Sequence, residues 1–506
     1  MKIFTTEEIR EIDKYTVEVE GISPLDLIEK VGEGIVAEVT SRWLPTKPVT
    51  IFAGPGNNGA DALAAARLLY EKGFKPKTFL FNIGGDRLSP DCQACRDRLV
   101  SLPGIDFTEI INNFSLPDLM KTHLVIDGLF GSGLRDHLTG GFTSLVQYIN
   151  ESRATVISID VPSGMFGDWN KDSIHRNVIH ADITLAIQFP RPAFFLRENA
   201  ELVGEWKILD IGLSQKASAT ILPTYYMIES NDVKRKLKRR HNFVTKADLG
   251  SAAIIAGSYG MMGAAVLATK AAIRGGVGKV TAISPRCGFN ILQSTVPDAL
   301  FLADKNEVIL TNISLRYDYS AIAIGPGIGT HEHTVSAVDD FLASMKRPLI
   351  VDADALNCIA KRPAMLNNLP VMSIITPHAG EFDRLFGHHS TDYERLTKAI
   401  EVSQQYNIFI ILKSHYTAII RPDGKIYFNS SGTPAMATAG SGDCLTGLIA
   451  SLLAQGYLPE IAAIMGVFIH GRAGEIAEQR QSLYSVSAMD ICDCIGPAIN
   501  SIMESD

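Results

Sequence analysis

Short apolar segments with strong strand preference alternate with helical segments along most of this 506-residue chain. The strand-like segments lie at residues 49–53, 77–81, 124–127, 156–160 and 182–186, and again at 252–256, 321–324, 349–352, 373–375 and 408–412. Continuous apolar strands separated by helices predict parallel sheets covered on both faces. The predicted fold class is therefore α/β, with functional loops where the strands end.

The alternation stops between residues 222 and 240, where Pro223 and two tyrosines precede a basic run at 233–240. We place a domain boundary there, giving domains at 1–225 and 226–506, because a chain of this length exceeds one ordinary hydrophobic core. A basic run of this kind is typical of a solvated linker or helix face. Contact with nucleotide phosphate is the alternative.

Composition narrows the class of partner. The charge balance is mildly acidic, 47 Lys and Arg against 55 Asp and Glu, which argues against a nucleic-acid or membrane-surface binder. Seven cysteines without paired metal-site spacing support neither a disulfide framework nor a metal site and favour a cytoplasmic compartment. No apolar run approaches the roughly 20 residues of a membrane span. A soluble protein acting on small molecules is expected.

A Gly-Ser-Gly-Asp sequence at residues 440–443 precedes an apolar helical segment at 448–453. Glycine lets backbone N–H groups approach a phosphate, and the N-terminus of the helix adds positive charge. Asp443 lies where a hydroxyl that receives a phosphoryl group would lose its proton. The alternative is a turn in which Asp443 caps the helix.

Other strand ends in the second half carry further candidate groups. Two are glycine-rich turns, at 257–265 and 325–329, where strand–helix packing is an equal explanation. His378 offers a hydrogen bond or a proton to a ligand. The alternative is a purely structural role. Lys413 offers a cation suited to diphosphate oxygens. Asp352 and Asp354 either organise magnesium or cap the next helix.

Three strands of the first half end in loops rich in glycine and polar residues, at 54–61, 127–135 and 160–164. In the first loop, Asn58 and Asp61 supply oxygens for a cation or for hydroxyl groups, although a structural turn is the alternative. Asp127 ends a buried strand, where a carboxylate requires a cation or several donors. Asp160 ends the third strand, and three such ends at one sheet edge form a site.

These loops make residues 1–213 resemble the NAD(P)H-hydrate epimerase domain, a Rossmann-like αβα sandwich. The resemblance implies that Asn58, Asp127 and Ser163 bind potassium, and that Asp160 contacts the hydrated nicotinamide ring and exchanges a proton with it. The residues implied to hold the dinucleotide are Asn57, Asn58, Gly59, Ala60, Asp61, Gly131, Ser132, Gly133, Leu134 and Arg135.

The chain departs from the epimerase pattern at Lys30, Ala60, Ala62 and Arg191. The family has lysine at the last of these positions. Arginine keeps the positive charge but does not readily give up a proton. Loss of epimerase activity is therefore an alternative for this half.

The second half resembles the ribokinase-like fold and, more closely, the NAD(P)H-hydrate dehydratase family, over residues 245–456. The resemblance implies substrate contacts from Ala264, Gly327, His378 and Asp443. The residues implied to bind nucleotide are Lys413, Ser414, His415, Tyr416, Thr417, Gly440 and Gly442, with Ser414 in place of the usual glycine. It also implies ADP as phosphoryl donor, with Mg²⁺ bridging the donor phosphates.

Together the two resemblances imply a fused enzyme that repairs hydrated NADH and NADPH, NADHX and NADPHX. The first half would interconvert the R and S epimers. In the second, Asp443 would take the proton of the ring hydroxyl, which is then phosphorylated and eliminated as phosphate. Open alternatives are a small-molecule kinase of the same fold, a non-catalytic N-terminal binding domain, and ATP in place of ADP. A homo-oligomer is expected.

Overall fold

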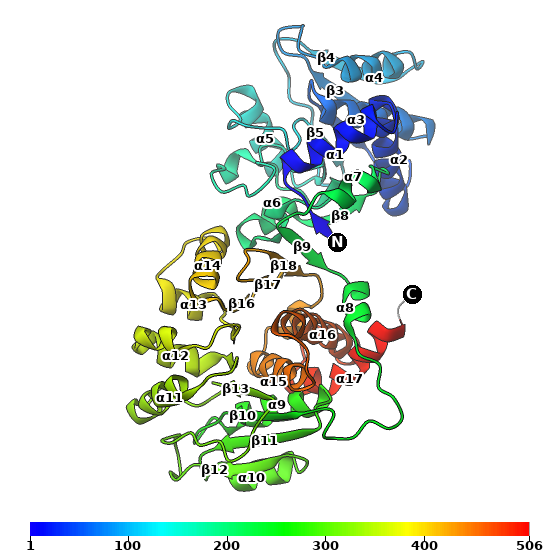
Figure 1. The fold of residues 1–506 in the computed structure, drawn as a ribbon. Helices are drawn as coiled ribbons and strands as arrows, with labels where there is room; N and C mark the ends of the chain where they lie inside the picture. Colours follow the sequence, from blue (N-terminus) through cyan, green and yellow to red (C-terminus); the bar gives the residue numbers. More distant parts are fainter. Residues whose placement is uncertain (505–506) are drawn as a thin grey trace. The chain divides into compact units, whose positions relative to one another are not determined.

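The computed structural model describes residues 1–504. It divides into two compact units, Lys2–Thr224 and Tyr225–Asp506, the second including Met1. Each unit is built on parallel strands with helices packed on them (Figure 1). This confirms the predicted α/β class. Within residues 1–504, no helix is long and apolar enough to cross a membrane.

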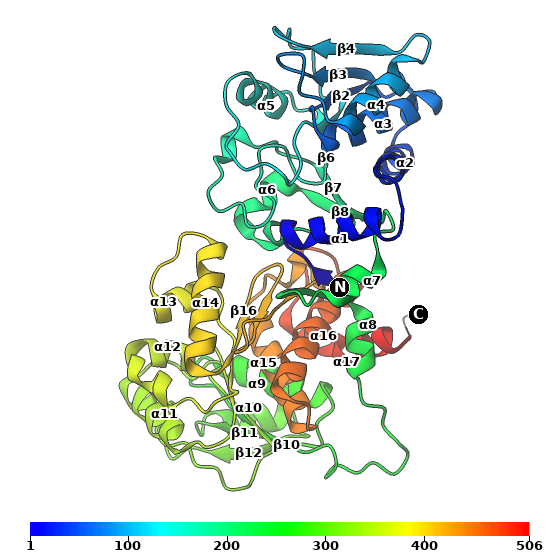
Figure 2. The same cartoon turned by 45° about the horizontal axis from the view of Figure 1, so that its top comes forward.

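The first unit contains a seven-stranded parallel sheet with the order β4-β3-β2-β5-β6-β7-β8. Its strands are β2 (Val49–Ala53), β3 (Lys77–Phe81), β4 (Asp106–Ile110), β5 (Leu124–Gly128), β6 (Thr155–Ile159), β7 (Ile183–Ile187) and β8 (Glu205–Leu209). Apolar clusters lie on both faces of the sheet. Helices α1 (Thr6–Glu18), α2 (Pro24–Arg42), α3 (Asn57–Glu71) and α4 (Pro90–Val100) contribute to one cluster, and α5 (Gly141–Glu151) to the other (Figure 2).

Local sequence signals explain where the first helices begin. Thr5 and Glu8 form a reciprocal capping box at the start of α1, and Ser23 caps α2, which has Pro24 in its first turn. Helix α3 begins at Asn57, inside the glycine-rich loop that follows β2. This start requires Gly59, since a Cβ there would overlap the carbonyl oxygen of Gly54.

In the second unit the strands follow the order β9-β18-β17-β16-β15-β14-β13-β10-β11-β12. Pairing is parallel except between β16 and β17 and between β17 and β18. The strands are β9 (Tyr225–Ile228), β10 (Ser251–Ile255), β11 (Lys279–Ser284), β12 (Leu300–Ala303), β13 (Ala321–Ile324), β14 (Ile350–Val351), β15 (Ile374–Ile375), β16 (Phe409–Leu412), β17 (Ala418–Ile420) and β18 (Ile426–Asn429).

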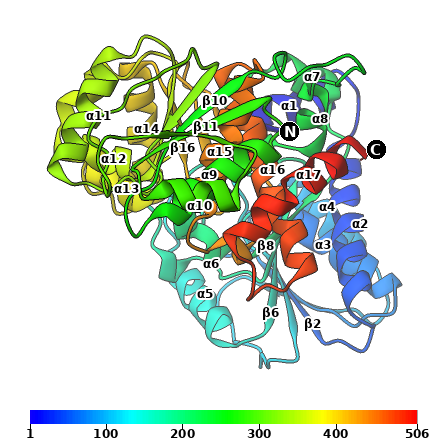
Figure 3. The ribbon, with the colours of Figure 1, turned by 90° about the horizontal axis from the view of Figure 1, so that it is seen from below.

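Two layers of helices enclose this sheet (Figure 3). One layer shares the large apolar core of the unit and contains α9 (Met262–Arg274), α15 (Ser441–Ala454), α16 (Pro459–Arg480) and α17 (Ala488–Glu504). The other contains α11 (Glu332–Ser344), α12 (Ala353–Lys361), α13 (Ala379–Phe386) and α14 (Asp392–Tyr406). The shared core places the first turns of α9 and α15 near each other.

The basic run at 233–240 has a structural role that the sequence did not indicate. It begins in α8 (Ser230–Lys236). Lys238 Nζ donates to the carbonyls of Gln455 and Gly456 (both 3.1 Å), and Arg240 donates to the carbonyl of Gly276 (2.6 Å). These carbonyls follow the ends of α15 and α9, where helices leave acceptors without partners. The run therefore anchors the chain to two helix ends.

Close packing of α9 on α15 yields a stability prediction. A Cβ on Gly447 would overlap the carbonyl oxygen of Ala268, so Gly447→Ala forces the two helices apart. We expect this variant to lower the free energy of unfolding by about 1–3 kcal/mol, measured by denaturant titration. Gly496→Ala in α17 is the control, because a Cβ there meets nothing within 4 Å. Equal stability of the two variants would contradict the packing argument.

Candidate active sites

Four neighbouring parallel strands, β13 to β16, end at one edge of the sheet in the second unit. Their following residues meet there. The Lys413 N–H donates to the Pro377 carbonyl (2.9 Å), and a Cβ on Gly325 would overlap the carbonyl oxygen of Asp352. The first turn of α15 joins them, since a Cβ on Gly442 would lie 3.3 Å from Lys413 Nζ. The structure thus brings together the groups predicted from separate loops.

The Gly-Ser-Gly-Asp segment is the start of α15. Gly440 is the residue before the helix, with φ of 89°, a conformation that favours glycine. Asp443 therefore lies in the first turn, and the alternative in which it caps the helix is wrong. The first intrahelical N–H is that of Cys444, which donates to the Gly440 carbonyl (3.2 Å). The N–H groups of Gly442 and Asp443 precede it and face a ligand at the helix N-terminus.

The buried Asp352 forms an ion pair with the half-buried Lys413 beneath this turn. Asp352 Oδ1 lies 3.0 Å from Lys413 Nζ, and Oδ2 accepts from Thr446 Oγ1 (2.7 Å). Asp352 occupies the N-cap position of α12, but its side chain makes no capping hydrogen bond to that helix. Glu381 Oε2 lies 3.7 Å from the same ammonium. Burial alone would lower the pKa of Lys413, but the two carboxylates outweigh it and raise that pKa.

Asp443 has a carboxyl group suited to proton exchange near neutral pH. Burial raises its pKa to about 7, and the negative charge of Asp352 adds to the effect, with Lys413 opposing. A general base is most effective when its pKa lies near the working pH. The arrangement places such a base one residue from the free N–H groups of the helix.

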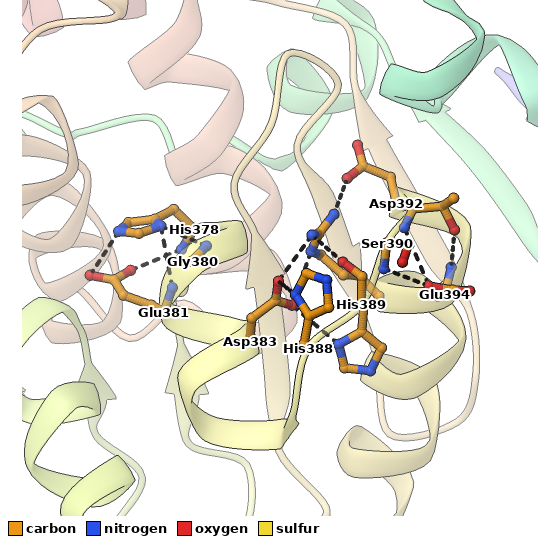
Figure 4. Close-up of polar contacts among 11 residues, drawn as sticks. His378, Gly380, Glu381, Asp383, His388, His389, Ser390, Asp392 and Glu394 are labelled. Carbon is orange, nitrogen blue, oxygen red and sulfur yellow. Dashed lines mark hydrogen bonds and ion pairs between the residues drawn. The ribbon is translucent and has the colours of Figure 1, made fainter.

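His378 caps α13 (Figure 4). Its Nδ1 accepts from the N–H groups of Gly380 (3.0 Å) and Glu381 (3.3 Å), while Glu381 Oε2 accepts from the His378 N–H (2.9 Å). Burial lowers the pKa of the imidazole. The ring is therefore neutral at neutral pH, with Nε2 as the donor. The structural alternative holds for Nδ1, and Nε2 lies 3.5 Å from Glu381 Oε1.

The other predicted dehydratase residues lie at two places. Gly327 packs against the first turn of α9, with 2.9 Å between Ala264 Cβ and a Cβ position at Gly327. Residues 414–417 form the turn between β16 and β17, closed by Thr417 Oγ1 donating to the Ser414 carbonyl (2.9 Å). The rings of His415 and Tyr416 lie in that turn, 4.4 Å apart.

Sequence reasoning missed three groups here. Glu381 stands three residues after His378, a capping-box spacing that could have identified it. Thr446 and His470 carry no such signal. His470 Nε2 lies 3.4 Å from Ser441 Oγ, and burial lowers the pKa of this imidazole to about 4. A neutral histidine therefore supports the glycine turn from behind.

The first unit contains a cavity of about 1120 Å³. Helix α1 lines it, together with the predicted residues Asn57, Asn58, Asp61, Gly131, Ser132, Gly133, Leu134, Arg135 and Asp160. Gly59 and Ala60 do not line it. Because α3 starts at Asn57, these two residues turn toward the strands and are buried.

Asp127 and Ser163 lie in the core beside this cavity. Asp127 accepts from the Ser163 hydroxyl (2.5 Å) and N–H (2.9 Å) and from the Ser158 hydroxyl (2.8 Å). The several donors expected for a buried carboxylate are thus present. Both side-chain polar atoms of Asn58 are buried without a hydrogen-bond partner within residues 1–504. An oxygen so placed suits a bound cation.

Asp160 is held by Arg191 at the cavity wall. Arg191 Nη2 donates to Oδ1 (2.5 Å) and the Ser132 N–H donates to Oδ2 (2.9 Å). Burial would raise the pKa of Asp160, but the guanidinium outweighs it and holds that pKa below its ordinary value. Asp160 is therefore ionised and a poor proton acceptor at neutral pH, unlike the role implied by the epimerase resemblance.

Comparison with known proteins agrees with this division of sites. Residues 24–193 match a family model described as the YjeF-related protein N-terminus, and residues 252–497 match one described as NAD(P)H-hydrate dehydratase. The bifunctional NAD(P)H-hydrate repair enzyme of Thermofilum pendens is 32% identical over 100% of this chain and 97% of its own length. That of Moorella thermoacetica is 30% identical over 100% and 98%.

The chain belongs to the bifunctional NAD(P)H-hydrate repair enzyme family. A crystal structure of the ADP/ATP-dependent NAD(P)H-hydrate dehydratase from Bacillus subtilis, co-crystallised with ATP and Mg²⁺, is 31% identical. It covers 55% of this chain and 98% of its own, with a TM-score of 0.49. Within this repair family, the Asp443 and Asp160 sites fall in the two separately matched halves.

The raised pKa of Asp443 predicts a pH-dependent cost in stability. The folded protein holds a proton up to about pH 7, whereas the unfolded chain releases it near the ordinary value. Stability is therefore lost as pH rises between about 4 and 7. Asp443→Asn lacks this group, so its advantage in melting temperature over the natural chain should grow from about pH 5 to about pH 8. A constant difference would contradict the raised pKa.

Proposed function

We propose that this protein repairs hydrated NADH and NADPH in two steps: epimerisation of R- and S-NAD(P)HX in the first unit and dehydration of the S epimer at the expense of ADP in the second. The observation that carries the proposal is the first turn of α15. There, a carboxyl group with a pKa of about 7 stands beside the open N–H groups of the first helical turn and a half-buried lysine. Family membership supports the same two activities.

The chemistry follows from the substrate. Its hydroxyl sits on the carbon beside the ring nitrogen, and hydroxide is a poor leaving group. Asp443 takes the hydroxyl proton as the oxygen attacks the phosphoryl group, and the N–H groups of Gly442 and Asp443 stabilise the charge that develops. Phosphate then leaves, expelled by the electrons of the ring nitrogen, and loss of a proton from the neighbouring ring carbon forms the C=C bond of the dihydronicotinamide. The products are the dihydronicotinamide, AMP and phosphate.

Lys413 has a more specific role than its charge alone indicates. Its ammonium is held by Asp352 and Glu381 and lies beside Gly442. A half-buried cation with fixed partners is already ordered before the nucleotide arrives, so it meets the diphosphate oxygens at little entropic cost. The exposed ring of His378, whose Nε2 lies 3.5 Å from Glu381 Oε1, is available to position the nicotinamide. The turn at 414–417 contacts the nucleotide.

Two cations complete the proposal. The buried, unpartnered Asn58 oxygen, with Asp127 and Ser163 nearby in the core, fits potassium, which would fix the dinucleotide loop by its charge. Magnesium would accompany the donor phosphates and neutralise them. Within residues 1–504, no group of three His, Cys, Asp or Glu side chains is arranged to hold a metal, which accords with a magnesium ion held chiefly by the nucleotide.

Fusion of the two units has a chemical reason. Only one configuration of the ring hydroxyl can point at Asp443, so the R epimer must be inverted before it is dehydrated.

The test is to supply both epimers with magnesium, potassium and ADP, then with ATP, and to follow the return of dihydronicotinamide absorbance. Full recovery supports both activities and identifies the donor. A plateau near the S fraction would leave a non-catalytic first unit.

The small-molecule kinase alternative shares the glycine turn and Asp443, but it would release a stable phosphorylated product. Free phosphate and regenerated dihydronicotinamide in equal amounts exclude it. A phosphorylated product without recovered absorbance would replace the dehydratase proposal.

Removing the base gives a direct prediction. Asp443→Asn should reduce the rate of dehydration by about 10²- to 10⁴-fold while leaving nucleotide affinity nearly unchanged, because the amide keeps the shape but cannot take a proton. Turnover and ADP binding are measured on the same preparation. Asp340→Asn, at an exposed position in α11, is the matched control. Near-normal turnover in Asp443→Asn would refute the assignment.

The potassium site predicts a cation-dependent stability. Potassium should raise the melting temperature of the first unit above its value in sodium at equal ionic strength, since a ligand bound only to the folded state stabilises it. Asn58→Ala should lose this difference, and the exposed Asn112→Ala should keep it. An unchanged response in Asn58→Ala would contradict the site.

A further inference from the structure

The cavity of the first unit contains a charged pair that cannot exchange a proton. Arg191 and Asp160 are both almost fully buried, with 3% and 8% of their side chains exposed, and lie 2.5 Å apart. Asp160 accepts a second bond from Ser132. Arginine does not release its proton in proteins. The pair therefore supplies fixed charge, and proton transfer in this cavity requires another group.

Arg191 also offers hydrogen-bond donors to a ligand. Within residues 1–504, its Nε and Nη1 are buried and have no hydrogen-bond partner, while Arg191 itself lines the cavity. A buried donor left unpaired costs free energy that a ligand acceptor recovers. The guanidinium therefore favours a ligand with a polar oxygen that accepts hydrogen bonds from Nε and Nη1.

Besides Asp160, five carboxyl groups line the same cavity: Asp13 and Glu18 from α1, Asp61 from α3, Asp91 from α4, and Asp136. Glu18 and Asp136 are exposed. Asp61 is buried, and burial followed by the charge of Asp160 raises its pKa well above the ordinary value. Asp13 is half-buried and lines the cavity. Burial raises its pKa to about 6, against the opposing charge of Arg191.

Geometry singles out Asp13. It lies one helical residue after the buried Ile12, which anchors α1 in the core. Within residues 1–504, its carboxyl group makes no hydrogen bond or ion pair, whereas Asp160 is bound on both oxygens. The charges of both Arg191 and Asp160 act on the Asp13 carboxyl group, so this carboxyl group of the cavity wall lies near the charged pair and is open to a ligand.

We propose that Asp13 is the acid–base catalytic residue of the epimerase site, with Arg191 binding an oxygen of the nicotinamide carboxamide. This rests on the proposed epimerase function. Asp13 donates its proton to the ring hydroxyl, the C–O bond breaks, and water leaves as the nitrogen lone pair forms a C=N bond. Water then adds to the opposite face, the electron pair returns to nitrogen, and the released proton returns to Asp13. Fixed Asp160 stabilises the cationic intermediate.

The test uses the full chain and pure R epimer, with the R-to-S ratio followed by chromatography and the spontaneous rate subtracted. Asp13→Asn should lower enzyme-dependent epimerisation at saturating substrate by about 100-fold or more, with a nearly unchanged KM. Asp13→Glu should recover much of the loss. Dehydration of the S epimer, measured in the same preparation, should not change. Glu11→Gln, exposed on α1, is the matched control.

Each outcome separates the two proposals. Epimerisation by Asp13→Asn at the natural rate, or a change in KM alone, overturns the role of Asp13 and leaves the epimerase standing. No acceleration by the natural chain overturns the epimerase and the role of Asp13 together. If Asp13→Asn does not fold, Asp13→Ser is the second variant, because it also lacks the carboxyl group. A folded Asp13→Ser with the natural rate likewise overturns the proposal.

Discussion

Parallel pairing of β13, β14, β15 and β16 is the constraint on which the second unit depends. Parallel neighbours bring their carboxyl ends to the same edge, so segments far apart in sequence meet there whatever lies between them. The β14 end supplies Asp352 and the β16 end supplies Lys413, and their ion pair ties the edge to α15 through Thr446. The glycine turn before Asp443 is held against this pair, which sets the environment of the base.

Each unit uses an ion pair to tune a neighbouring carboxyl group. Burying two charges is costly, and such pairs are weak evidence for stability. Here their effect is electrostatic. Asp352 outweighs Lys413 at Asp443 and, with burial, moves that pKa to about 7. In the first unit, Arg191 fixes Asp160 in its ionised form, and burial moves the pKa of Asp13 to about 6. In both units the unpaired carboxyl group is the one able to exchange a proton.

The replacement of lysine by Arg191 therefore changes which residues of the first unit can exchange a proton. A lysine could release a proton and share it with Asp160, whereas arginine holds its charge permanently. The substitution removes that exchange but adds two buried N–H donors facing the cavity. Acid–base chemistry then passes to a residue on α1, a helix outside the three strand-end loops.

Sequence alone determined the α/β class, most of the parallel interior strands and the loops that carry the sites, because continuous apolar runs and Gly-Asp turns are local signals. It did not predict the interior strands β11, β17 and β18. It also missed the edge strands β4 and β8, which lack a continuous apolar run, and β12, which is apolar but only four residues long and partly exposed. Nor did it identify His470 or Asp13, whose roles come from neighbours distant in the chain. Only the tertiary structure decided which carboxyl groups are paired, since burial and the distance to a counter-charge set each pKa, and both arise only when separate elements pack together.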